Sequence, residues 1–127
     1  MTHYLTVEQV LFIHARLIEE TGGSHGVRDL GLLEAAVMRP RATFGGVEMY
    51  PTVFAKASAL LHSLIGNHPF VDRNKRTGIT TAGLFLVQNV FRLPVSNADW
   101  EAFLLSVITE TLNILAMAAW FEANSQA

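Results

Sequence analysis

Apolar side chains recur at helical spacing along almost the whole chain, and this pattern favours a bundle of helices. Such a spacing places the apolar residues of each segment on one face, which a compact fold buries. The segments are residues 7–21, 30–37, 53–65, 75–89, 97–111 and 111–121. We therefore expect an all-α fold, a compact bundle of about six helices.

Residues that favour helix starts precede most of these segments. Thr6 and Gln9 have the spacing of a capping box, in which each residue pairs with the backbone of the other. Further side chains suited to an N-cap stand before later segments, namely Asp29, Thr52 and Ser96 or Asn97. The helix boundaries can therefore be predicted from local sequence.

Length, charge and composition exclude several classes of protein. With 127 residues we expect a single domain, 1–127, and a net charge of −2 argues against direct nucleic-acid binding. The absence of cysteine excludes disulfides and is compatible with a reducing cytoplasm. The N-terminus lacks a signal peptide pattern.

Residues 103–121 approach the length of a membrane span, but Glu110 and Asn113 interrupt them, so we expect two buried helices and a cytoplasmic protein.

The stretch HPFVDRNKRTG, residues 68–78, concentrates groups that are capable of chemistry. It offers the imidazole of His68, the carboxylate of Asp72, the amide of Asn74 and the cations of Lys75 and Arg76. The apolar run that follows predicts a helix, with Asp72 or Asn74 as its N-cap.

Together these groups indicate phosphoryl or nucleotidyl transfer. Unpaired N–H groups at a helix start, with Lys75 and Arg76 beside them, favour an anion such as phosphate. A carboxylate next to phosphate suits Mg²⁺, which gives Asp72 the role of metal ligand. His68 has the chemistry of a general base for an attacking hydroxyl. In a purely structural interpretation, the same residues cap a helix, form a turn or are simply solvated.

The motif resembles the signature of the Fic/Doc family. Its Fic branch reads roughly HPFxxGNGRxxR, and its death-on-curing (Doc) branch reads roughly HxFxDxNKR. Lys75 and Ile79 replace the second glycine and the final arginine of the Fic pattern, and both changes match Doc. Arg73 departs from both branches, which usually place Gly or Ala there. A side chain resists positive φ, so Arg73 either strains the loop or adds a phosphate contact.

The resemblance implies a Fic fold and a function. It implies a Doc-like toxin of a type II toxin–antitoxin system, a protein kinase that transfers the γ-phosphate of ATP to a threonine of elongation factor Tu and halts translation. His68 would be the catalytic base, Asp72 would bind Mg²⁺, and Asn74, Lys75 and Arg76 would bind the phosphates.

The same resemblance also indicates how the protein would be regulated, and two alternative functions remain open. Ser106 with Glu110 is the nearest match to the inhibitory motif of Fic proteins, but Ile79 replaces the arginine that such a glutamate pairs with. We therefore expect inhibition by a Phd-like antitoxin. The alternatives are a Fic-type AMP transferase, or an inactive protein that binds an antitoxin or regulates its operon.

Residues 39–51 predict a hairpin, because Gly45 and Gly46 suit the positive φ angles of a tight turn. We expect a flap beside the active site, whose free edge accepts a substrate segment as an added strand, as the resemblance also implies. The alternative is an ordinary connector.

Overall fold

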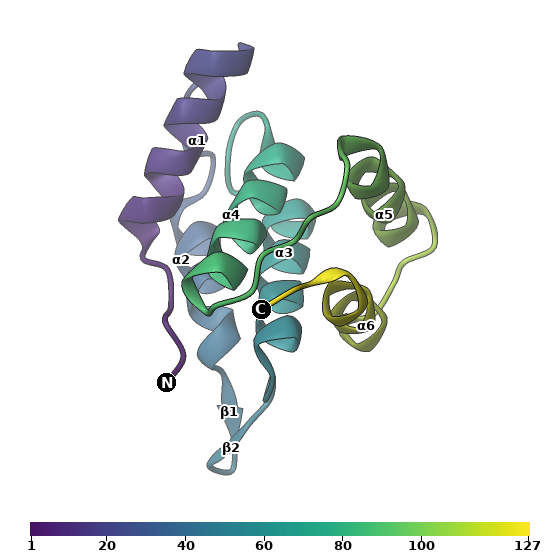
Figure 1. Cartoon of the computed structure of the whole chain (residues 1–127). Helices are drawn as coiled ribbons and strands as arrows, with labels where there is room; N and C mark the ends of the chain where they lie inside the picture. The colour runs from purple at the N-terminus through teal and green to yellow at the C-terminus, as the bar shows by residue number, and fades with distance from the viewer.

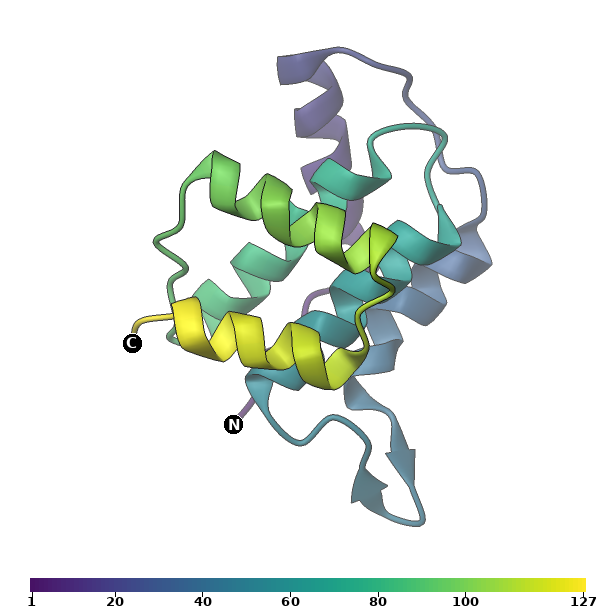
Figure 2. The ribbon, with the colours of Figure 1, turned by 90° about the vertical axis from the view of Figure 1, so that its right-hand side faces the viewer.

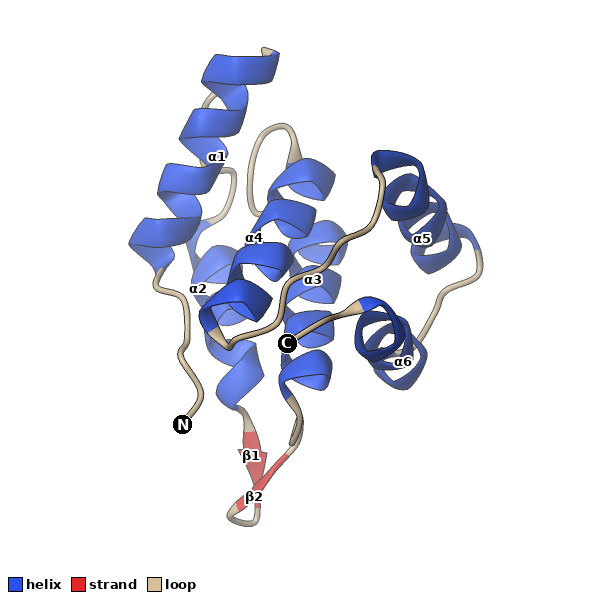
Figure 3. Cartoon of the chain, in the orientation of Figure 1, coloured by secondary structure: helices blue, strands red, loops and turns tan.

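The computed structural model describes the whole chain, Met1–Ala127, as six α-helices and one short hairpin (Figures 1 and 3). The helices are α1 (Val7–Thr21), α2 (Leu30–Met38), α3 (Val53–Asn67), α4 (Asn74–Gln88), α5 (Asn97–Thr109) and α6 (Ile114–Asn124). A 3₁₀ turn, η1 (Arg39–Arg41), follows α2 and leads into strands β1 (Thr43–Phe44) and β2 (Val47–Glu48). The predicted all-α fold is confirmed. None of the helices combines the length and the apolar character that crossing a membrane requires.

Helix α3 lies at the centre of the bundle and packs against α2, α4 and α6. Helices α1 and α2 cover one side of the α3–α4 pair, and α5 and α6 cover the other (Figures 1 and 2). The core consists of apolar side chains from all six helices, including Phe103, Leu104 and Val107 of α5, together with Leu5 and Phe70. Phe103 stacks on Trp120 of α6 with their ring centroids 3.9 Å apart. Residues 103–121 thus contribute two helices to one core.

The predicted caps are present at four helix starts. In α1 the hydroxyl of Thr6 accepts a hydrogen bond from the N–H of Gln9, and the Gln9 side chain accepts one from the N–H of Thr6. Single side-chain caps begin α2, α3 and α5, at Asp29, Thr52 and Ser96. Each of these bonds spans only three residues, which explains why local sequence predicts them.

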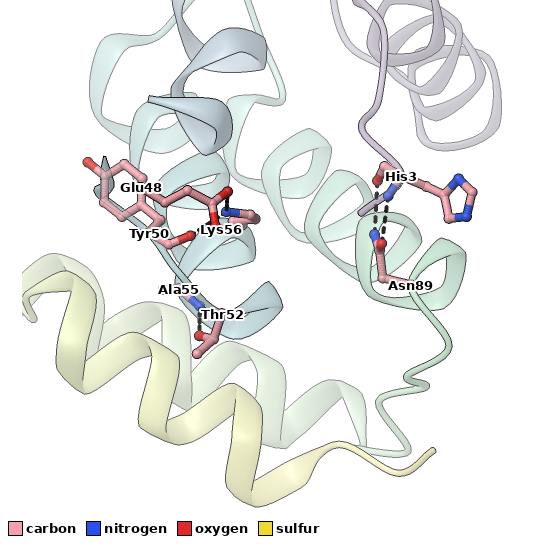
Figure 4. A network of polar contacts seen from close by, with 7 residues as sticks. All are labelled: His3, Glu48, Tyr50, Thr52, Ala55, Lys56 and Asn89. Carbon is pink, nitrogen blue, oxygen red and sulfur yellow. Dashed lines mark hydrogen bonds and ion pairs between the residues drawn. The ribbon is translucent and has the colours of Figure 1, made fainter. Parts of the chain in front are cut away.

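The hairpin forms at the predicted position. Gly45 and Gly46 adopt φ angles of 59° and 80°, and Thr43 pairs with Glu48 across the two strands. The ammonium group of Lys56, on the first turn of α3, donates to the Glu48 carboxylate at 2.9 Å and to the carbonyl of Tyr50 (Figure 4). This ion pair ties the hairpin to the start of α3.

The expected location of the hairpin was wrong. The hairpin precedes the N-terminal end of α3, whereas the motif at residues 68–78 follows its C-terminal end (Figures 1 and 2). The 15 residues of α3 separate the two by roughly 22 Å at 1.5 Å per residue. The flap is therefore not beside the motif, because a rigid helix stands between them.

Candidate active site

Residues His68–Arg73, here called the motif loop, connect α3 to α4. Both ends of this loop adopt the left-handed region, with φ of 48° at His68 and 62° at Arg73. Such a conformation costs a residue with a side chain about 1–2 kcal/mol, and it persists where the surroundings determine the backbone. Hydrogen bonds from neighbouring segments therefore have to hold the backbone of the loop in this conformation.

The predicted N-cap of α4 was wrong. Arg73 occupies that position, and no side chain caps the helix. The Asp72 carboxylate accepts hydrogen bonds from the N–H of Arg73 at 2.8 Å and of Ser24 at 3.2 Å. The Asn74 amide pairs with both the N–H and the carbonyl of Phe70, at 2.9 and 3.0 Å. Both side chains thus brace the motif loop and leave the start of α4 uncapped.

The start of α4 combines unpaired donors with positive charge. No protein acceptor pairs with the backbone N–H groups of Asn74, Lys75 and Arg76. The side chains of Lys75 and Arg76 are exposed, and neither forms an ion pair, since the two ion pairs of the protein lie elsewhere. Unpaired N–H groups, the helix dipole and two free cations together favour a bound anion.

Two neighbouring cavities share these cations. The first, of about 450 Å³, is lined by His68, Val71, Asp72, Arg73, Asn74, Lys75 and Arg76. The second, of about 370 Å³, lies between α1, α4 and α5 and is lined by Leu17, Lys75, Arg76, Ile79, Thr80, Asn97, Trp100, Glu101 and Leu104. All five site residues predicted from the sequence therefore line one cavity, and a partly apolar cavity adjoins it.

The Asp72 carboxylate lines the first cavity and carries a negative charge. The hydrogen bond from the N–H of Ser24, followed by the one from Arg73, lowers the pKa of its carboxyl below the ordinary value. It is therefore ionised at neutral pH. Each carboxylate oxygen accepts one of these two bonds, so further lone pairs remain for a cation. The chain has no group of three or more side chains that could together hold a metal ion.

His68 presents a free imidazole to the first cavity. The residue is exposed, and its side chain forms no hydrogen bond within the protein. Its ring nitrogens are thus available to an incoming hydroxyl group. The orientation of the ring depends on the backbone that carries it.

The segment Gly22–Asp29, which connects α1 to α2, supports the motif loop and was missed in the sequence. Ser24 binds the Asp72 carboxylate, and Gly26 accepts a hydrogen bond from the N–H of Val71. Arg28 binds the carbonyl of His68 in the loop and that of Asn67 at the end of α3. A side chain at Gly23 would stand 2.6 Å from a carboxylate oxygen of Asp72, and its φ of 111° strongly favours glycine. Gly22 and Gly23 are adjacent in the sequence, but the residues that they contact, Asp72 and Arg73, lie more than 40 positions further along the chain.

His14 supports the loop from α1. Its ring stacks on Phe70 with the centroids 3.9 Å apart, and its Nε2 lies 2.9 Å from the carbonyl oxygen of Asp72. The residue is buried. His14 is therefore a hydrogen-bonded histidine of the core.

Arg73 does strain the backbone, and its side chain points to α1. The guanidinium donates to the carbonyls of Thr21 and Gly22, at 3.2 and 3.1 Å. Carbonyls at the C-terminal end of a helix carry partial negative charge, so they are favourable partners for a cation. Arg73 therefore joins the motif loop to the end of α1, and these bonds offset the cost of its positive φ.

Replacing Arg73 by alanine should destabilise the protein by about 1–2 kcal/mol, because the strained φ stays while the two bonds to α1 are lost. Arg73→Gly loses the same bonds but removes the strain, so it should be roughly 1 kcal/mol more stable than Arg73→Ala. Urea denaturation of the three proteins measures both differences. An alanine variant as stable as the parent would show that the bonds to α1 contribute nothing.

Comparison with known proteins gives consistent similarities. A model described as the Fic/DOC family matches residues 4–86, which include the motif loop and α4. The chain is 50% identical over 93 residues to the protein named Toxin Doc of Mycolicibacterium smegmatis, covering 73% of this chain and 69% of that protein. It is 33% identical over 86 residues to the protein named Protein kinase doc of Escherichia phage P1, covering 68% of each.

Proposed function

Because the chain belongs to the Fic/Doc family, we propose that it is the toxin of a type II toxin–antitoxin pair and acts as a protein kinase. The similarity to a protein named as a toxin and to one named as a protein kinase supports a Doc-like toxin with Fic-type transferase chemistry. The proposed reaction transfers the γ-phosphate of ATP to a threonine of elongation factor Tu, which would halt translation.

One observation carries this proposal. The unpaired N–H groups at the start of α4 and the cations of Lys75 and Arg76 border the same cavity as His68 and Asp72. A phosphoryl group bound at the helix start would thus lie next to a base and a carboxylate. Phosphoryl transfer depends mainly on positioning and on charge stabilisation, which this arrangement provides.

The residues have distinct roles in the proposed step. His68 accepts the proton of the threonine hydroxyl while its oxygen forms a bond to the γ-phosphorus, and the bond from that phosphorus to the bridging oxygen of ADP breaks. Lys75, Arg76 and the N–H groups of α4 balance the phosphate charge, and Asn74 keeps one amide hydrogen free beyond its bond to Phe70. Asp72 would hold Mg²⁺, which neutralises phosphate charge when bound.

The second cavity suits the remainder of the nucleotide. It shares Lys75 and Arg76 with the first cavity and adds the indole of Trp100 with the apolar side chains of Leu17 and Leu104. An apolar and aromatic wall next to cationic groups matches a molecule with a flat base and a charged phosphate chain. ATP would then extend across both cavities.

The proposed partner is a Phd-like antitoxin. Glu110, part of the nearest match to an inhibitory motif, lies at the end of α5 in a cavity between α5 and α6 that contains no residue of the motif loop. This placement leaves Glu110 away from the motif loop, and the antitoxin is proposed from the similarity to a protein named as a toxin.

The proposal is tested with purified protein, elongation factor Tu, Mg²⁺ and ATP labelled at either the α- or the γ-phosphate. We expect elongation factor Tu to acquire label from the γ position only, at a threonine that mass spectrometry can identify. Label from the α position would instead establish AMP transfer. No label from either would favour another target or an inactive protein that binds an antitoxin.

A further inference from the structure

The backbone conformation of His68 determines where its imidazole points. The side chain is exposed and has no hydrogen-bonding partner in the protein, so no second side chain orients the ring. The residue is the C-cap of α3 and adopts φ 48° and ψ 59°. Glycine is the usual residue in this conformation at a helix end, because a side chain raises its energy. Something outside α3 must hold His68 in place.

Arg28 supplies that support from the connecting segment. Its Nε donates to the carbonyl of His68 at 2.6 Å, and one terminal nitrogen donates to the carbonyl of Asn67, also at 2.6 Å. The backbone N–H groups of Arg28 and Asp29 both donate to the carbonyl of Pro69, at 2.8 and 3.0 Å. Three successive carbonyls, before, at and after the candidate base, are therefore bound by one short piece of chain.

The charge of Arg28 suits this position. Helix α3 has no basic residue in its last turn, so its negative dipole end lacks a cation of its own. Arg28 forms no ion pair with any carboxylate, since the two ion pairs of the protein are Arg16–Glu20 and Glu48–Lys56. The next residue, Asp29, is the N-cap of α2, so Arg28 is anchored at the start of a helix.

Arg28 does not border the places where a substrate would bind. It lines neither the cavity next to His68 nor the adjoining cavity with Trp100. An effect of Arg28 on the reaction must therefore act through the residues that it holds.

We propose that Arg28 is a positioning residue, whose guanidinium locks the backbone of His68 in the left-handed conformation that directs the imidazole into the active-site cavity. The proposal rests on the function proposed above, in which His68 is the base. A planar guanidinium reaches two neighbouring carbonyls at once, whereas a lysine ammonium acts as a point charge and does not reproduce that fork. Arg28→Lys should therefore lose the positioning while keeping the charge.

The kinetic test compares Arg28→Ala and Arg28→Lys with the parent in transfer of labelled γ-phosphate to elongation factor Tu. We expect kcat to fall roughly 10–100-fold in both variants, because a small displacement of a reacting group has effects of this size. KM for ATP should stay unchanged, and added guanidinium ion should restore part of the activity of Arg28→Ala. Arg16→Ala, which removes an exposed arginine from the middle of α1, is the matched control and should behave like the parent.

A structural readout separates this proposal from the proposed function. The backbone coupling constant between the amide and α protons of His68, together with its chemical shifts, reports φ by NMR without any substrate. We expect these values to change in both Arg28 variants and to stay fixed in Arg16→Ala. If the parent transfers no phosphate, the proposed function fails, while a shifted His68 in the folded variants still supports the positioning role.

Two results would overturn the proposal. One is a folded Arg28→Lys variant in which both the His68 backbone and kcat are unchanged. The two hydrogen bonds from Arg28 to the carbonyls of His68 and Asn67 would then have no role in positioning the imidazole. The other is a raised KM for ATP with normal kcat, which would make Arg28 a substrate contact. Circular dichroism identifies any variant that fails to fold, and Arg28→Lys, which retains the charge at the end of α3, decides the outcome if Arg28→Ala unfolds.

Discussion

Replacing His68 by alanine is expected to lower phosphate transfer by about 10²–10⁴-fold, the usual contribution of a general base, with almost no change in stability. The imidazole is exposed and makes no hydrogen bond within the protein, so its removal breaks no structural contact. A large loss of rate without a loss of stability is the signature of a residue that acts on the substrate.

The positive φ of His68 requires a second variant. Asparagine tolerates the left-handed region better than most residues and has no basic nitrogen, so His68→Asn should keep the loop geometry and lose the reaction. His3→Ala is the control, because His3 is also exposed but lines neither cavity and lies outside the segments that form the site. Single-turnover transfer from γ-labelled ATP measures the rates. Activity retained in His68→Asn would assign the base to another group.

Glu48→Gln is expected to destabilise the protein by about 1–3 kcal/mol and to lower Tm by roughly 3–10 °C, although half of the Glu48 side chain is exposed. The reason lies in its partner, since the side chain of Lys56 is only 2% exposed and has no other anionic group beside it (Figure 4). In the variant the glutamine amide oxygen can still accept a hydrogen bond from the ammonium, as the carbonyl of Tyr50 does, but the buried positive charge no longer has a negative charge beside it. An unbalanced buried charge costs more than a surface pair contributes.

Lys56→Met tests this explanation in the opposite direction. Methionine fills most of the volume of the lysine stem and carries no charge. We therefore expect Lys56→Met to lower the free energy of unfolding by less than about 1 kcal/mol, which is a smaller loss than that expected for Glu48→Gln. Adding Glu48→Gln to Lys56→Met should then have almost no further effect, which a double-mutant cycle by urea denaturation measures.

Glu20→Gln, in the exposed pair with Arg16, is the control and should change stability by less than about 0.5 kcal/mol. Equal losses from Glu48→Gln and Glu20→Gln would show that the burial of Lys56 has no energetic consequence.

Local sequence was sufficient to predict the helices and most of their caps. Thr6, Asp29, Thr52 and Ser96 each bond to a backbone N–H three residues later, so the pattern and its partner lie within one turn. The hairpin was predicted for a similar reason. Its turn requires positive φ angles, and the two residues that adopt them, Gly45 and Gly46, are adjacent in the sequence.

Contacts between distant segments explain the failures. Asp72 looked like an N-cap because its true partner, Ser24, is 48 residues away. The unusual backbone of Arg73 was correctly suspected, but nothing in its neighbourhood showed that its guanidinium would bind Thr21 and Gly22. The wrong location of the hairpin has a different cause, because the helix predicted over residues 53–65 already separates the hairpin from the motif in the sequence.

The pairing of Gly22–Asp29 with the motif loop also bears on how the protein folds. Residues that bind each other directly across this pairing, such as Arg28 and His68, are 40 positions apart. Closing a chain of that length loses entropy before any contact compensates for it, whereas helices form from neighbouring residues. The reactive geometry is therefore absent from any intermediate that contains only helices. It arises only with the tertiary contacts that join these two segments, so a partly folded chain would have helical structure before it had the proposed activity.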